Sequence, residues 1–387
     1  MRTTLLILAA FLAIPTARAQ TWNGPYGSIL DDPLTAGQGA RALAHLYDMN
    51  PAGARLVIDS LKTRYPQHPI GPFLDGLIIW WEILPELSVD DGSNDRAFFD
   101  AMDRTIRAAD RLPNRFRMDR TFFKAAALGF RGRHLSNREQ WLRAARDGKE
   151  SLDLVFELSE ADPANPDFQF GVAVYKYFAE AIPEQYPVVK PVMLFFPNGD
   201  REEGLRLLHR VARDGRFVGT EAAYFLLQIY MVFEPDFGQA QRMVELLRER
   251  HPANAFFHVL EGRVQARWGR YHTSMEVFEE ILALHRQAAT GYTDGIAQAS
   301  LYYLGRSQMA TGDLDETVRT FDRLETLAGE DRHSAYRALG RLRAGMALDR
   351  LGRRSEAQAA YRLVLRLPEI GDSHDDARRY LRSPFGS

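Results

Sequence analysis

The sequence contains no cysteine, and this absence removes several structural and chemical possibilities. Without a thiol, the chain can form neither a disulfide nor a thiolate metal site. A bacterial lipoprotein needs a cysteine directly after its signal sequence, so lipid attachment by that route is excluded. The stability of the fold must therefore come from packing of the 45% of residues that are hydrophobic.

Long hydrophobic runs are also scarce. One apolar run, residues 5–14, follows the positive charge of Arg2 and precedes an A-x-A pattern at residues 17–19. This run has about half of the roughly 20 residues that a membrane-spanning helix needs, and the pattern is typical of a signal peptide. We expect cleavage after Ala19 and export to the periplasm or cell envelope, with an uncleaved membrane anchor as the alternative.

Lysine is rare, with 5 residues against 44 arginines, and the net charge is only −2. Residues 20–103 carry 5 basic and 12 acidic side chains, whereas residues 104–149, the basic block, carry 13 basic and 4 acidic ones. Candidate binding residues in the block include Arg107, Arg111 and Arg131. An exported protein rarely meets nucleic acid, so we expect an anionic lipid, a glycan or an acidic partner there, or simply solvated helix faces beside acidic neighbours.

Catalytic and cofactor motifs are nearly absent. A G-x-G-x-x-A pattern at residues 37–42 lacks the preceding strand that a dinucleotide site requires. The E-x-x-H spacing of Glu330 and His333 occurs once, where a di-iron bundle needs two such helices. Trp80 and Trp81 fit a sugar pocket, but their apolar neighbours favour one buried and one half-buried ring. We expect no catalytic residue, cofactor or metal, and a protein that is not an enzyme.

A repeated spacing is what the sequence does contain. Gly345 is followed by Ala357 after twelve residues, by Tyr361 after sixteen and by a closing Pro368. Small residues let two antiparallel helices approach closely, the large residue fills the groove between them, and the proline ends the second helix. The residues that define this spacing along the array are Gly262, Gly305, Gly345, Ala240, Ala357, Phe278, Phe321 and Tyr361. The pattern resembles the tetratricopeptide repeat (TPR) family, which implies helix pairs stacked into a solenoid.

The N-terminal half follows the same spacing only with insertions. Gly76, Gly129 and Gly171 take the glycine position there, each in the first helix of a pair. We therefore expect an all-α, TPR-like α-solenoid. Its expected parts are a signal peptide at residues 1–19, an extended segment at 20–35, divergent helix pairs at 36–220, a regular array at 221–370, and a polar capping helix with a tail at 371–387.

A proline-rich insert at about residues 183–199 interrupts the repeat that holds Gly171. Its apolar candidates for partner contact are Tyr186, Val192, Phe195 and Phe196. If exposed, they would offer a docking surface; if folded back, they would plug the groove between helices. We expect the plug, because joint exposure of these side chains would promote aggregation. The insert ends on Asp200 and Glu203, which form the pattern of a capping box.

The residues after the insert carry a second resemblance. A Gly-Asp-Arg-Glu-x-Gly-Leu core at residues 199–205 is similar to the corresponding junction of a eukaryotic TPR family associated with clearance of lipid-droplet-linked inclusion bodies, and the likeness covers residues 165–282. That family is viewed mainly as a helical-repeat adaptor, which implies repeat geometry and no catalytic residues. The sequence predicts a non-catalytic scaffold or adaptor for protein partners. The alternative is a binder of lipid or glycan that uses the insert and the basic block.

Overall fold

The computed structural model describes residues 28–86, 92–185, 187, 190, 196–329 and 334–386. Within these ranges the chain forms helices and no strand, which confirms the all-α prediction. The α-helices are α1 (Pro33–Tyr47), α2 (Pro51–Arg64), α3 (Ile70–Ile83), α4 (Asp95–Asp110), α5 (Arg117–Asn137), α6 (Trp141–Ala161), α7 (Pro166–Gln185), α9 (Arg201–Asp214), α10 (Gly219–Gln228), α11 (Phe237–Arg250), α12 (Ala255–Arg267), α13 (Tyr271–Arg286), α14 (Asp294–Thr311), α15 (Leu314–Ala328), α16 (Ala335–Arg350), α17 (Arg354–Val364) and α18 (Ser373–Arg382). No helix of the described part is long and apolar enough to cross a membrane.

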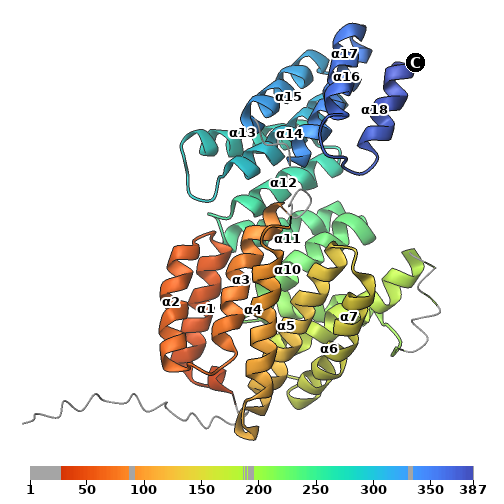
Figure 1. The fold of residues 1–387 in the computed structure, drawn as a ribbon. Coiled ribbons are helices and arrows are strands. Elements are labelled where there is room, and N and C mark those ends of the chain that lie inside the picture. Colours follow the sequence, from red (N-terminus) through yellow and green to blue (C-terminus); the bar gives the residue numbers. More distant parts are fainter. Residues whose placement is uncertain are drawn as a thin grey trace, which may run out of the picture.

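Consecutive helices pack against each other as hairpins, which confirms the predicted α-solenoid (Figure 1). In the C-terminal array, the first helices of the repeats also pack directly on one another, α12 on α14 and α14 on α16. Their partners α13, α15 and α17 lie outside this row. The first helices therefore form the inner layer of the array, and the second helices form the outer layer.

The glycine spacing corresponds to direct contacts in the C-terminal array. A Cβ placed on each crossing glycine would lie 2.5–2.6 Å from a ring of the partner helix: Gly262 faces Phe278, Gly305 faces Phe321 and Gly345 faces Tyr361. All three rings are buried, as are the small residues Ala240 and Ala357. The absence of a glycine side chain is what allows the two helices of each repeat to approach so closely.

Two glycines of the N-terminal half do not lie where the spacing predicts. A Cβ on Gly129 would meet nothing within 4 Å, and Gly132 is the residue that approaches α6. Gly171 faces α6 instead of α9. The close contact between α7 and α9 comes from Gly204, whose Cβ would lie 2.6 Å from the backbone nitrogen of Tyr177. The spacing was wrong here because insertions between helices change which turn of each helix faces its partner.

Several local expectations also need correction. Helix α1 begins at Pro33, inside the segment expected to be extended. Helix α7 continues through Pro183 to its end at residue 185, because a proline in the last turn removes only one backbone hydrogen bond. Asp200 caps α9 by accepting from the Glu203 N–H at 3.0 Å, but its own N–H donates to a carbonyl of α7, so the capping box is not reciprocal. Trp81 is buried, as Trp80 is, and is not half-buried.

The N-terminal repeats close on the C-terminal ones instead of forming an open arc. Asn254, the N-cap of α12, donates from Nδ2 to the carbonyl oxygen of Tyr47 in α1 at 2.5 Å. Trp81 of α3 packs edge-on against Tyr47 and Phe257, with 5.2 and 5.7 Å between ring centroids. One buried core therefore continues from residue 29 to residue 344. Figure 1 shows the N-terminal helices as one body from which the C-terminal helices extend.

Candidate functional site

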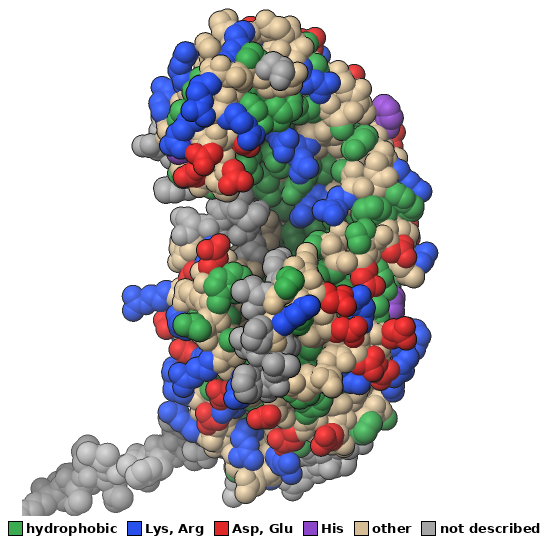
Figure 2. All heavy atoms as spheres, turned by 90° about the vertical axis from the view of Figure 1, so that its right-hand side faces the viewer, with side chains coloured by type: hydrophobic (Ala, Val, Ile, Leu, Met, Phe, Trp, Pro, Cys, Tyr) green, Lys and Arg blue, Asp and Glu red, His purple; other side chains and the backbone are tan. Residues whose placement is uncertain are grey.

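The inner helices of the array border a concave face of the molecule. Figure 2 shows a hollow between the C-terminal helices above and the N-terminal body below, and hydrophobic and basic side chains gather in it. The inner row that forms this face consists of α12, α14 and α16. Stacked repeats create such an extended surface whatever the ligand is.

Arginine side chains of the inner helices lie over a cluster of tyrosine rings, of which Tyr303 is half-buried and Tyr302 and Tyr336 are buried. Arg263 of α12 lies over the ring of Tyr303, 5.0 Å from its centroid. Arg306 of α14 lies over Tyr302 and Tyr303, at 5.6 and 5.7 Å. Tyr302 in turn contacts Tyr336 of α16, with 5.5 Å between centroids. These guanidinium-to-ring distances are within the range of cation–π attraction, so the rings hold the charged groups in place.

Arg133 of α5 extends the series to the N-terminal body. Its guanidinium lies 5.0 Å from the Trp80 and Phe225 centroids and 5.4 Å from that of Tyr224. Burial raises the pKa of the Tyr224 hydroxyl, and Arg133 and Arg263 oppose this rise, so both positive charges lie near the same oxygen. We call the whole set the arginine–tyrosine stripe; it consists of Arg133, Tyr224, Arg263, Tyr303, Arg306, Tyr302 and Tyr336.

Most of the stripe was not singled out from the sequence, although a signal for it was present. Arg263 directly follows the crossing glycine of its repeat, and Arg306 does the same in the next repeat. Arg133 follows Gly132, the glycine that approaches α6. Successive residues of an α-helix are about 100° apart around its axis. These three arginines therefore point away from the partner helix, whereas Gly345 is followed by the buried Met346.

The candidates in the insert are only partly described. Tyr186, Val192 and Phe195 lie outside the described residues, as do Glu330 and His333. Phe196 is half-buried and helps to line a hollow of about 490 Å³ at the end of α7. The plug in the groove stays a prediction.

The three candidates in the basic block have different surroundings. Arg131 donates to both carboxylate oxygens of Asp147 at 2.7 Å and to Asp103 at 2.5 Å, which ties α5 to α6 and to α4. Arg131 therefore bridges three helices, and its role in docking stays a prediction. Arg107 of α4 and Arg111, the C-cap of that helix, are exposed, with no carboxylate of the described chain within 4.0 Å. Of the three, these two are available to an anionic ligand.

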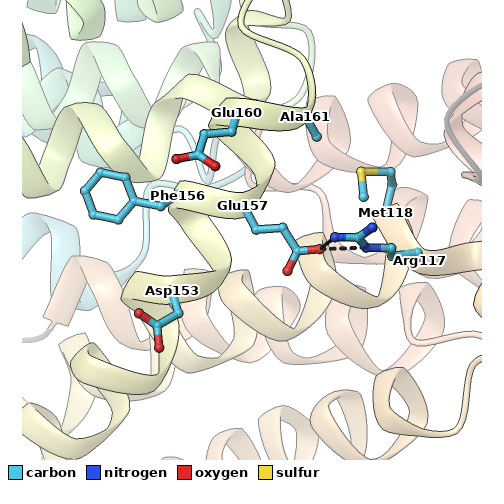
Figure 3. Close-up of a pocket in the computed structure, with 7 residues that line it drawn as sticks. All are labelled: Arg117, Met118, Asp153, Phe156, Glu157, Glu160 and Ala161. Atoms are coloured by element: carbon cyan, nitrogen blue, oxygen red, sulfur yellow. Dashed lines mark hydrogen bonds and ion pairs between the residues drawn. The ribbon is translucent and has the colours of Figure 1, made fainter.

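A shallow hollow beside α5 and α6 is lined mainly by residues of α6, three of which are acidic (Figure 3). Arg117 of α5 donates to Glu157 at 2.9 Å, whereas Asp153 and Glu160 lie apart from this pair in Figure 3. Nowhere in the described ranges do three or more histidine, aspartate or glutamate side chains gather so as to hold a metal. This hollow is a solvated helix face.

Asp119 is a buried carboxyl group with three contacts. It accepts from Ser28 Oγ at 2.5 Å and from the Ile29 N–H at 2.7 Å, and it lies 3.1 Å from His68 Nε2. The carboxylate stands between the serine and the histidine, so the histidine is not placed to take a proton from the hydroxyl, as a hydrolytic triad requires. The cluster fixes the first described residues on α5.

Comparison with known proteins agrees with this architecture. Residues 193–289 match the family model described as Iml2/Tetratricopeptide repeat protein 39, and residues 299–327 match one described as Tetratricopeptide repeat. A search of the curated proteins finds no match. Repeats of this kind generally mediate protein–protein interactions. The chain is therefore a tetratricopeptide repeat protein whose central helices resemble the Iml2/Tetratricopeptide repeat protein 39 family.

Proposed function

We propose that this protein is an exported, non-catalytic scaffold that binds a segment of a partner protein on the concave face of its TPR array. The observation that carries the proposal is the arginine–tyrosine stripe, which occupies the inner layer of the repeats. Arginine and tyrosine are enriched at the centres of protein interfaces, because each offers a large contact area together with a polar end. The partner meets the scaffold in the cell envelope.

Position-specific crosslinking tests this face. A photo-crosslinking amino acid replaces Arg306 on inner helix α14 in one variant and Arg319 on outer helix α15 in the other; both side chains are exposed. We expect a discrete crosslinked partner from position 306 and none from position 319. Equal crosslinking at the two positions, or crosslinking from α15 alone, would contradict binding on the concave face.

Export is supported by the positive residue Arg2, the apolar residues 5–14 and the A-x-A pattern at residues 17–19. Residues 1–35 fused to alkaline phosphatase, which is active only outside the cytoplasm, are expected to give an active and shortened fusion. Leu8→Arg interrupts the apolar run and serves as the control, with loss of activity expected. An inactive parent fusion, or equal activity of the two fusions, would argue against export.

A binder of lipid or glycan is the second candidate, and one surface favours it. Trp141 and Leu142 at the start of α6 are 63% and 90% exposed, and they lie inside the basic block. Exposed aromatic and apolar side chains beside basic ones are typical of membrane-surface contacts. If this candidate is right, the protein floats with phosphatidylglycerol vesicles, and the double change Trp141→Ser and Leu142→Ser abolishes flotation. Absence of flotation at low salt excludes the lipid.

A further inference from the structure

We propose that the concave face recognises an extended partner segment with acidic side chains at regular intervals. The carboxylates bind the guanidinium groups of Arg133, Arg263 and Arg306, and the segment's other side chains pack on Tyr303, the half-buried ring of the stripe. The other three tyrosines of the stripe are buried and support the arginines from within the core. This inference rests on the proposed scaffold function and adds the chemistry of the partner to it.

The first support is that the arginines recur at one position of the repeat. Each follows a glycine that lies against a neighbouring helix, at residues 132, 262 and 305. The glycine fixes the rotation of its helix, so Arg263 and Arg306 take the same orientation in their two successive repeats. The next repeat has the buried Met346 at this position. Helices that pack directly, as α12 and α14 do, have axes about 8–10 Å apart. A segment in the polyproline II conformation rises about 3.1 Å per residue and returns its side chain to the same face every third residue, which predicts an acidic side chain at every third position.

The second support is the environment of the guanidinium groups. Arg263 and Arg306 lie over tyrosine rings, and no carboxylate of the described chain lies within 4.0 Å of either group. A ring covers the face of a guanidinium and leaves its N–H edge free. That edge is the part that matches a carboxylate with two parallel hydrogen bonds. The groups are held in position and still have their strongest donors available.

Other arginines of the array form ion pairs with carboxylates of the same chain. Arg337 and Arg341 both bind Glu325, at 2.6 and 3.0 Å, and Arg341 also binds Asp322 at 2.7 Å. These pairs join α16 to the outer helix α15. Arg263 and Arg306 lack such partners in the described chain, whereas the charge of Arg133 opposes the rise in pKa that burial causes at the carboxyl group of Glu221 in α10.

The third support is the separation of charge between the two layers. Inner helices α12, α14 and α16 contain seven arginines and three acidic residues, whereas outer helices α13, α15 and α17 contain five arginines and eight acidic residues. The whole chain carries a net charge of −2. The positive character is therefore local to the inner layer, and it complements an acidic ligand.

The experiment measures binding of short fluorescein-labelled peptides to the full chain by fluorescence anisotropy. One peptide carries glutamate at every third position between valine and threonine, a second carries glutamine instead, and a third carries lysine. We expect saturable binding of the glutamate peptide that weakens with salt, and no binding of the other two. The double variant Arg263→Gln and Arg306→Gln is expected to weaken binding at least about tenfold, since charge-assisted hydrogen bonds are lost.

Matched variants separate charge at the stripe from charge elsewhere. Arg286→Gln with Arg362→Gln removes two exposed arginines of the outer helices α13 and α17 and should leave the affinity unchanged. Circular dichroism melting of each variant shows that its fold is retained. Equal binding of the glutamate and glutamine peptides, or equal loss in the two double variants, would overturn the acidic recognition. Polyphosphate or anionic vesicles that bind at the stripe while the glutamate peptide does not would also overturn it.

Failure of this inference is distinguishable from failure of the scaffold function. If position 306 still crosslinks a partner but the glutamate peptide does not bind, the concave face binds protein through other chemistry. If position 306 yields no partner and the peptide does not bind, the scaffold function itself fails.

Discussion

Single glycines set the distance between the two helices of a repeat, and the chain provides a matched pair to test this. A Cβ on Gly262 would lie 2.6 Å from the buried ring of Phe278, whereas one on Gly129 would meet nothing. Gly262→Ala should destabilise the protein by about 1–3 kcal/mol through overpacking. Gly129→Ala should be neutral or stabilising by up to about 1 kcal/mol, because alanine is the better helix former. Urea unfolding measures both, and equal destabilisation would contradict the assignment of the crossing glycines.

A buried histidine makes stability depend on pH. Burial lowers the pKa of His258 to about 3, and its Nδ1 lies 3.1 Å from the Tyr292 hydroxyl oxygen. In the unfolded chain the pKa is about 6.5, so the unfolded state takes up the proton first as the pH falls. The stability contributed by neutral His258 is complete above pH 6.5 and is lost progressively toward pH 3.

His258→Gln should remove this dependence. From about pH 7 to pH 5 the wild type should lose about 2 kcal/mol of unfolding free energy through His258, and the variant should lose correspondingly less. His272→Gln, at an exposed position of α13, is the control and should keep the wild-type slope. Urea unfolding at the two pH values checks this. Identical slopes for wild type and His258→Gln would mean that His258 does not contribute to the pH dependence of the unfolding free energy.

Two N-cap residues, Thr293 and Asn254, differ in the contacts that they make beyond their own helix. Thr293 caps α14 through the Ile296 N–H and does nothing beyond that helix end in the described contacts. Asn254 caps α12 through the Phe257 N–H and also donates to the Tyr47 carbonyl oxygen. Thr293→Ala should cost about 1 kcal/mol. Asn254→Ala should cost about 1–3 kcal/mol more, because a buried carbonyl oxygen loses its donor. Equal losses in thermal unfolding would show that the contact with α1 adds nothing.

The sequence could predict contacts between residues that are close along the chain, and it could not predict contacts between distant ones. The spacing from Gly262 to Phe278 lies within one helix hairpin, so a pattern in the sequence is enough to identify it. The contact of Asn254 with Tyr47 joins residues 207 positions apart, and no local pattern encodes it. Gly129 was chosen over Gly132 because the insertions remove the fixed period on which the spacing depends. The position of Arg306 after Gly305 carries little signal in the sequence, because arginine is common throughout this chain.

At the scale of the whole molecule, the two ends of the array differ in the elements against which they pack. The core that includes Trp81 joins α3 to α12 and continues to residue 344. A second, smaller core around Tyr361 holds α16, α17 and α18 together at the C-terminal end. The concave face lies between the N-terminal body, whose helices pack on each other and on α12, and the C-terminal unit α16–α18, which packs on the array from one side. We therefore expect the two ends to open with different free energies.

Hydrogen exchange read by mass spectrometry on two large-to-small variants tests this difference. Tyr361→Ala removes a fully buried ring whose hydroxyl donates to Asp349 at 2.9 Å. It should cost about 3–5 kcal/mol locally and increase exchange in α16–α18, with protection kept in α1–α12. Trp81→Ala should cost a similar amount but increase exchange in α1, α3 and α12 together, since the ring joins all three. If both variants increase exchange uniformly along the chain, the molecule unfolds as one cooperative unit and the two ends are not independent.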